Sequence, residues 1–146
     1  MYTMYTIDTF EEIDYCLSMG YNPLLFNNNF DIEPKTRYEY LKRMFGDGHG
    51  HRENERFFRY MWDIKPHYCE ECLKPLAGYS AVYISHIITR GSNPMIAHDP
   101  RNINILCFNC HNRWEHANTR KGMRIYQSNL EKIKVLKRDS LKLQKK

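Results

Sequence analysis

The residues of this chain that could do chemistry gather between Ile84 and His116. His86 follows an apolar run, Asn102 lies sixteen residues later, and His111 lies nine residues beyond that. Metal-assisted hydrolysis of a phosphodiester needs a base to deprotonate water, a divalent cation to stabilise charge, and a group that orients the base. Imidazole suits the first task because its unperturbed pKa lies near neutral pH. This histidine, asparagine and histidine set therefore suggests chemistry on a phosphodiester.

Four cysteines form two Cys-x-x-Cys pairs, one upstream of His86 and one just before His111: Cys69, Cys72, Cys107 and Cys110. In a reducing cytosol such pairs are more often metal ligands than disulfides, and Zn²⁺ takes four thiolates in a tetrahedron. The pairs are separated by 34 residues, more than the roughly 15 to 20 of a plain four-cysteine zinc site. We therefore expect a structural zinc ion with a functional insertion between the pairs. Reduced core cysteines and a redox pair are the alternatives.

The elements that must position these residues are predicted from apolar periodicity and from turn residues. A glycine-rich segment, 46–51, should separate two of the helices. In chain order, we expect helices over about 10–19, 35–45 and 53–62, a strand over 79–88, a short strand over 103–106, a helix over about 110–116 and a C-terminal helix from about 126.

Length and composition restrict the class of protein. The 146 residues suffice for one domain, and a 42% hydrophobic and 14% aromatic content is that of a globular chain. No apolar run approaches the roughly 20 residues needed to span a bilayer, and the first residues lack the pattern of a signal peptide. We therefore expect a cytoplasmic protein without membrane association.

The net charge of +5 is spread unevenly along the chain. Residues 117–146 hold ten Lys or Arg and two acidic residues, a net +8, so residues 1–116 carry −3. A basic segment beside a hydrolytic centre suits a polyanion such as nucleic acid. The alternative is a solvated helix face that only keeps the protein in solution.

Together these motifs resemble the HNH endonucleases. The resemblance rests on a Cys-x-x-Cys pair, a strand that ends in His86, and an Asn-x-x-x-x-Cys-x-x-Cys-His run, and it extends from about Tyr68 to His116. It implies a ββα-metal active site in which His86 is the general base and Asn102 braces the loop and orients that base. It also implies that His111 binds the catalytic cation, which would be Mg²⁺, Mn²⁺ or another divalent ion.

Further ligands of that cation are less defined. Glu115 is a candidate because it lies four residues after His111 and so shares one helix face with it, and His116 is its competitor. Many HNH endonucleases carry Asp, Glu or His immediately before the base, where this chain has Ser85. Ser85 could contribute through a bridging water, Glu115 and His116 could supply the charge instead, or the domain could be inactive.

Basic residues near these motifs could contact phosphates, because guanidinium groups match phosphate geometry. The candidates are Arg90, Arg101, Arg113, Arg120, Lys121 and Arg124.

We therefore expect an α+β protein with a helical N-terminal region over 1–65, a zinc-bound nuclease module over 66–118 and a basic C-terminal helix over 119–146, all in one compact domain. The expected function is metal-dependent cleavage of DNA by a monomer or homodimer, with one copy nicking one strand. A non-catalytic zinc-stabilised DNA-binding module and an RNA-directed nuclease are the alternatives. The family that the chain resembles is used in phage packaging, mobile-element mobility and restriction, and the sequence indicates no target site.

Overall fold

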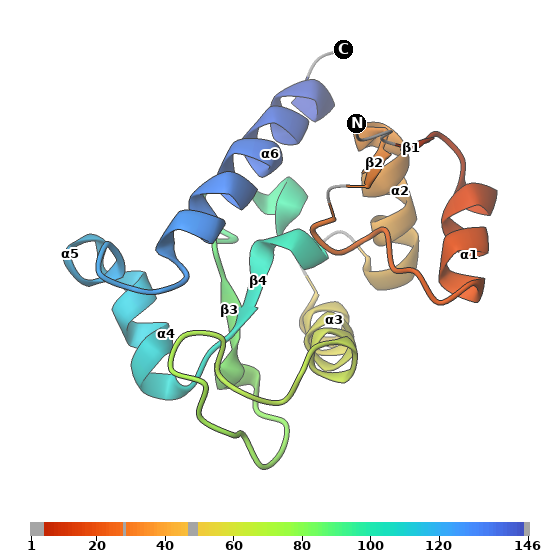
Figure 1. The fold of residues 1–146 in the computed structure, drawn as a ribbon. Coiled ribbons are helices and arrows are strands. Elements are labelled where there is room, and N and C mark those ends of the chain that lie inside the picture. The colour runs from red at the N-terminus through yellow and green to blue at the C-terminus, as the bar shows by residue number, and fades with distance from the viewer. Residues whose placement is uncertain (1–4, 28, 47–49, 145–146) are drawn as a thin grey trace.

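A computed structural model describes residues 5–27, 29–46 and 50–144 of the chain. These residues form six α-helices and two small sheets, so the architecture is α+β, as predicted (Figure 1). In chain order the elements are β1 (Tyr5–Ile7), α1 (Phe10–Ser18), β2 (Phe30–Ile32), α2 (Pro34–Phe45), α3 (His51–Ile64), η1 (Ala81–Tyr83), β3 (Ile84–His86), η2 (Pro94–Ile96), η3 (Pro100–Asn102), β4 (Ile103–Ile105), α4 (Phe108–Glu115), α5 (Ala117–Arg120) and α6 (Tyr126–Gln144), where η marks a 3₁₀ turn.

The first three helices confirm the elements predicted from periodicity, with small shifts at their ends. Pro34 occupies the first position of α2, where the missing N–H is not needed, and Glu33 accepts a hydrogen bond from the Thr36 N–H at 2.8 Å. Residues 47–49 of the glycine-rich segment lie outside the described ranges. Two parallel strands, β1 and β2, complete this N-terminal part of the protein.

The second sheet and α4 follow one another in ββα order. β3 and β4 are antiparallel, with Ser85 opposite Asn104 and His86 opposite Ile103. The predicted strand over 79–88 is longer than the observed one, because residues 81–83 form a 3₁₀ turn and only 84–86 pair. β-branched and aromatic residues favour a strand, but β4 offers only three residues for pairing.

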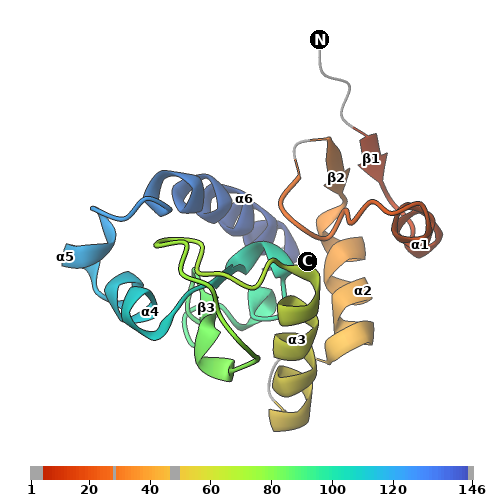
Figure 2. The same cartoon turned by 60° about the horizontal axis from the view of Figure 1, so that its bottom comes forward.

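One apolar core joins the N-terminal helices to the ββα unit. Phe57 and Met61 of α3, Ile105 of β4 and Trp114 of α4 belong to the same cluster of buried side chains. Figure 2 shows α2 and α3 on one side of the module and α4 on the other. The site is therefore built on a scaffold that includes the N-terminal helices.

The C-terminal helix α6 lies along the module and also packs against α2 (Figure 1). Its buried face is unusually polar, since Asn129, Asp139 and Ser140 are buried beside Leu136. The structure describes no helix with the length and apolar character that a membrane crossing requires.

Candidate metal centre and active site

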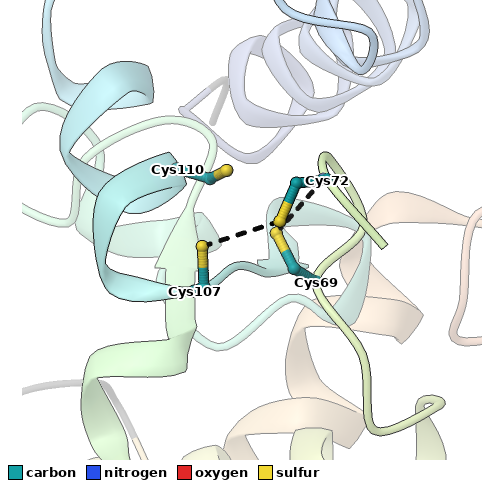
Figure 3. A group of neighbouring side chains, drawn as sticks. All are labelled: Cys69, Cys72, Cys107 and Cys110. Atoms are coloured by element: carbon teal, nitrogen blue, oxygen red, sulfur yellow. Dashed lines mark hydrogen bonds between the residues drawn. The ribbon is translucent and has the colours of Figure 1, made fainter. Parts of the chain in front are cut away.

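The two Cys-x-x-Cys pairs converge, as predicted. Their four sulfur atoms lie within 4.8 Å of one another, and the Sγ atoms of Cys72 and Cys107 are 3.9 Å apart (Figure 3). Four thiolates bound to Zn²⁺ at about 2.3 Å in a tetrahedron would be about 3.8 Å apart. The four cysteines are therefore close enough to hold a tetrahedral zinc ion after small side-chain adjustments.

The surroundings of these thiols favour a bound cation. Burial raises the pKa of Cys69, but the N–H groups of Cys72, Cys107 and Glu71 more than offset this and bring it to about 7. Burial, with the neighbouring thiols, raises the pKa of Cys110 far above its usual range. Four thiolates at this spacing thus need a positive charge among them, which a divalent metal supplies.

The two glutamates between Cys69 and Cys72 fasten the first cysteine loop, residues 67–76, to the rest of the protein. Glu70 accepts hydrogen bonds from the Ile105 N–H at 2.5 Å and from Asn104 Nδ2 at 3.1 Å, and forms a 2.9 Å ion pair with Lys65. This role was not predicted from the sequence, because two adjacent acidic residues in a turn ordinarily indicate only that their side chains are exposed to solvent.

Glu71 makes the corresponding connection to the C-terminal part of the chain. Its carboxylate accepts hydrogen bonds from the backbone N–H groups of Arg124 and Ile125 at 2.9 and 3.0 Å. These two residues lie immediately before α6. The first cysteine loop is therefore bonded to β4 through one glutamate and to the start of α6 through the next.

His86 lies at the end of β3 with its ring half-buried beside Phe58 of α3. Its Nε2 is 3.0 Å from the carbonyl oxygen of Ala97. Because a carbonyl only accepts, Nε2 carries the proton and Nδ1 keeps its lone pair. Burial lowers the pKa of His86 to about 4. The hydrogen bond to Ala97 raises this pKa, and positive charge on Arg90, His98 and His111 lowers it further. His86 is therefore a neutral imidazole at pH 7.

Asn102 is fully buried and holds the backbone that follows His86. Its Oδ1 accepts from the Ile88 N–H at 2.8 Å, and its Nδ2 donates to the Ile88 carbonyl at 2.9 Å. Its own carbonyl accepts from the Ile87 N–H at 2.8 Å. These three bonds tie the start of the loop between β3 and β4 to its end.

His111 and Glu115 face each other on α4. His111 Nδ1 is 2.6 Å from the Val82 carbonyl oxygen, and His111 Nε2 is 3.1 Å from Glu115 Oε1. The Val82 carbonyl requires a proton on Nδ1, which leaves Nε2 of a neutral ring as an acceptor. Two acceptors at this distance need a proton or a cation between them, so the pair suits a divalent metal.

The other two candidate ligands lie elsewhere. His116 is the C-cap residue that follows α4, and its backbone is extended, so it leaves the helix face of His111 and Glu115. Ser85 is fully buried, and its Oγ makes no hydrogen bond within the described residues. Because neighbouring side chains alternate across a strand, Ser85 faces away from His86.

The basic candidates divide into exposed and buried residues. Arg90, Arg113, Lys121 and Arg124 are exposed. Arg120 is half-buried, with its guanidinium over the Trp114 ring at 4.3 Å.

Arg101 is only 7% exposed, and its guanidinium forms 2.8 Å ion pairs with Asp99 and Asp139. The structure therefore groups Arg101 with a buried ionic network and not with the exposed basic residues.

The ββα order, with four converging cysteines at its base and histidines on its strand and helix, defines a small metal-binding module of the ββα-metal type. The family model described as HNH endonuclease matches residues 69–116. This interval includes all four cysteines, β3, β4 and α4. Residues 69–116, about a third of the chain, thus match the model of an HNH endonuclease domain. Searches of curated proteins and of solved structures give no match to the chain.

Proposed function

We propose that this protein is a metal-dependent endonuclease that hydrolyses DNA phosphodiester bonds. His86 is the general base, His111 and Glu115 hold a catalytic divalent cation, and the four cysteines hold a structural zinc ion. The observation that carries the proposal is the His111 Nε2 to Glu115 Oε1 pair at 3.1 Å, on the helix of a domain whose β3 strand ends in a neutral histidine.

The ligand pair is suited to a hard cation. One carboxylate and one neutral imidazole leave most coordination positions to water and to phosphate oxygens, as Mg²⁺ and Mn²⁺ prefer. When bound there, the cation would supply electrostatic stabilisation of the charge that develops on the phosphate and on the departing oxygen. Ser85 receives no ligand role in this proposal because its hydroxyl is buried and faces away from His86.

His86 performs the proton transfer. Its Nδ1 lone pair accepts a proton from the attacking water, while the Ala97 carbonyl holds the Nε2 proton and prevents the ring from presenting the wrong nitrogen. A positive charge on His111 would lower the pKa of His86, so the two histidines act within one electrostatic environment. Asn102 supports the base indirectly, through the backbone that follows it.

A nicking assay tests the base. We expect zinc-loaded protein with Mg²⁺ or Mn²⁺ to nick supercoiled plasmid, and His86→Ala to reduce the rate by about 100-fold or more, the usual contribution of a general base. His51→Ala, which removes an exposed histidine at the start of α3, is the matched control. Nicking by His86→Ala at the parental rate would eliminate His86 as the base. If the parental protein binds plasmid without nicking it, the protein is a DNA-binding module and not a nuclease. Labelled RNA assayed in parallel tests whether the protein prefers RNA to DNA.

A second comparison tests the ligands. We expect Glu115→Gln to lower the nicking rate by about 10-fold and to raise the Mg²⁺ concentration needed for half-maximal activity, because an amide oxygen binds a hard cation more weakly than a carboxylate does. His116→Gln should change neither quantity by more than about two-fold, because His116 lies beyond the helix face of His111. A larger effect of His116→Gln than of Glu115→Gln would show that His116, and not Glu115, is the metal ligand.

A further inference from the structure

The carbonyl that orients His86 belongs to a short turn between η2 and η3. Ala97 follows η2, and Asp99 precedes η3, so the two residues lie in one turn. Asp99 closes this turn, since its Oδ1 accepts from the Arg101 N–H at 3.0 Å and its own N–H donates to the Ile96 carbonyl at 3.1 Å. The position of the Ala97 carbonyl therefore depends on how Asp99 is held.

Arg37 of α2, in the N-terminal part of the protein, holds the Asp99 carboxylate. Its Nη1 is 3.0 Å from Asp99 Oδ1 and also donates to the Leu24 carbonyl at 2.9 Å, while its Nη2 donates to the Pro23 carbonyl at 2.9 Å. The arginine is only 4% exposed. Three acceptors on one planar guanidinium leave Arg37 little freedom, so α2 and the turn have a fixed relation.

Arg101 holds Asp99 from the other side. Its Nη2 is 2.8 Å from Asp99 Oδ2 and 2.8 Å from Asp139 Oδ2 of α6. Burial alone would raise the pKa of Asp99, but the two arginines hold it below its usual value. Burying a carboxylate costs much more free energy when one of its two cationic partners is removed. Without Arg37, we therefore expect the turn to move so that Asp99 reaches water or another hydrogen-bond donor.

We propose that Arg37 is a positioning residue for His86: by holding Asp99 from α2, it fixes the Ala97 carbonyl that orients the imidazole. The N-terminal helices thereby take part in the active site, although the HNH match begins only at residue 69. The expected effect of Arg37 on the rate of DNA cleavage rests on the proposed function, whereas its expected effect on the orientation of the His86 ring does not.

The test uses the full-length zinc-loaded protein with Arg37→Met, which keeps most of the aliphatic stem and removes the guanidinium. We expect the nicking rate at saturating protein to fall by about 10-fold, the usual effect of losing an outer-shell partner, with DNA affinity changed by less than about two-fold. The ¹H–¹⁵N spectrum of the histidine rings should show that His86 no longer holds its proton on Nε2 alone. Arg37→Lys should give a smaller change of the same kind, and it replaces Arg37→Met if that variant does not fold.

Ile13→Ala is the control for stability. Ile13 is fully buried in α1, so its truncation destabilises the protein through a cavity, whereas the network residues lie in α2, α6, η3 and the turn before η3. Altered His86 signals and slower nicking in the Arg37 variants, with parental values in Ile13→Ala, support the proposal. Parental His86 signals in the Arg37 variants overturn it, whether or not nicking slows. If the parental protein does not nick DNA, the proposed function fails and the ring spectrum alone decides this inference.

Discussion

Main-chain carbonyls orient both histidines of the proposed catalytic pair. The Ala97 carbonyl lies against Nε2 of His86, and the Val82 carbonyl lies against Nδ1 of His111. Each carbonyl fixes which ring nitrogen carries the proton, and the two rings consequently present different nitrogens: Nδ1 in His86 and Nε2 in His111. This difference matches the two proposed tasks, proton abstraction by one histidine and metal binding by the other.

The lowered pKa of His86 predicts a loss of stability in mild acid. Its pKa is about 4 in the folded protein but about 6.5 in an unfolded chain. As the pH falls, His86 is protonated in the unfolded chain before it is protonated in the folded protein. The free energy of unfolding therefore keeps its full value above about pH 6.5 and decreases as the pH falls toward 4. We expect His86→Gln to weaken this dependence, with the free energy of unfolding measured by urea titration at several pH values. Equal pH dependence in both proteins would contradict the assigned shift.

At the scale of elements, the four cysteines join short pieces of the ββα unit. β3 and β4 have three residues each, and α4 has eight. Cys107 caps α4 and Cys110 lies in its first turn, so a bound ion would connect this helix directly to the first cysteine loop.

Removing the metal is therefore expected to melt the module. Elemental analysis should find one zinc ion per chain, and a chelator should lower Tm by at least about 10 °C, because a four-cysteine zinc site contributes on the order of 10 kcal/mol. Cys72→Ser should reproduce the effect without a chelator, whereas Cys16→Ser, in α1 and outside the cluster, should not. The assignment would fail if the chelated protein kept the parental Tm.

At the scale of the whole molecule, charge is strongly polarised. Residues 1–34 contain six acidic residues and no Lys or Arg, whereas residues 117–146 carry a net +8. Both ribbon views place α1 at the opposite end of the molecule from α4 and α5 (Figures 1 and 2). Most of this basic charge lies on α6, but the exposed Arg113, Lys121 and Arg124 lie at or near the α4 and α5 end. We therefore expect a nucleic acid to bind at this end, which also carries His111 and Glu115.

Exposed basic residues at that end should account for much of the salt dependence of DNA binding. The combined variant Arg113→Gln, Lys121→Gln and Arg124→Gln should weaken binding and flatten the slope of log K against log salt by up to about 3, roughly 0.9 for each phosphate that the protein no longer neutralises. Arg120 is left intact because its Nε donates to the Trp114 carbonyl at 2.8 Å. The slope is measured by fluorescence anisotropy with a labelled duplex.

The matched control removes the same three charges from exposed positions of α2: Lys35→Gln, Lys42→Gln and Arg43→Gln. This variant should bind with the parental slope. If both combined variants flatten the slope equally, binding reflects net charge alone and the proposed orientation on DNA is wrong.

Much of the scaffold could be predicted from the sequence, because it depends on local rules. Helices α1 to α3 follow from apolar periodicity and their end residues, and the convergence of four cysteines follows from ligand chemistry and spacing. The strand over 79–88 was predicted too long, because its length depends on how much partner strand is available, and β4 provides three residues.

By itself, the sequence determined which residues are candidates: the cysteines, His86, Asn102 and His111 are marked by type and spacing, which are properties of the chain alone. Only the tertiary structure decided how their neighbours are used. It buried Arg101 between two carboxylates, turned Ser85 away from His86, and brought Arg37 to Asp99 across 62 positions of sequence. The physical reason is that the role of a charged or polar side chain depends on its burial and on the partner within hydrogen-bonding distance, and long-range folding sets both.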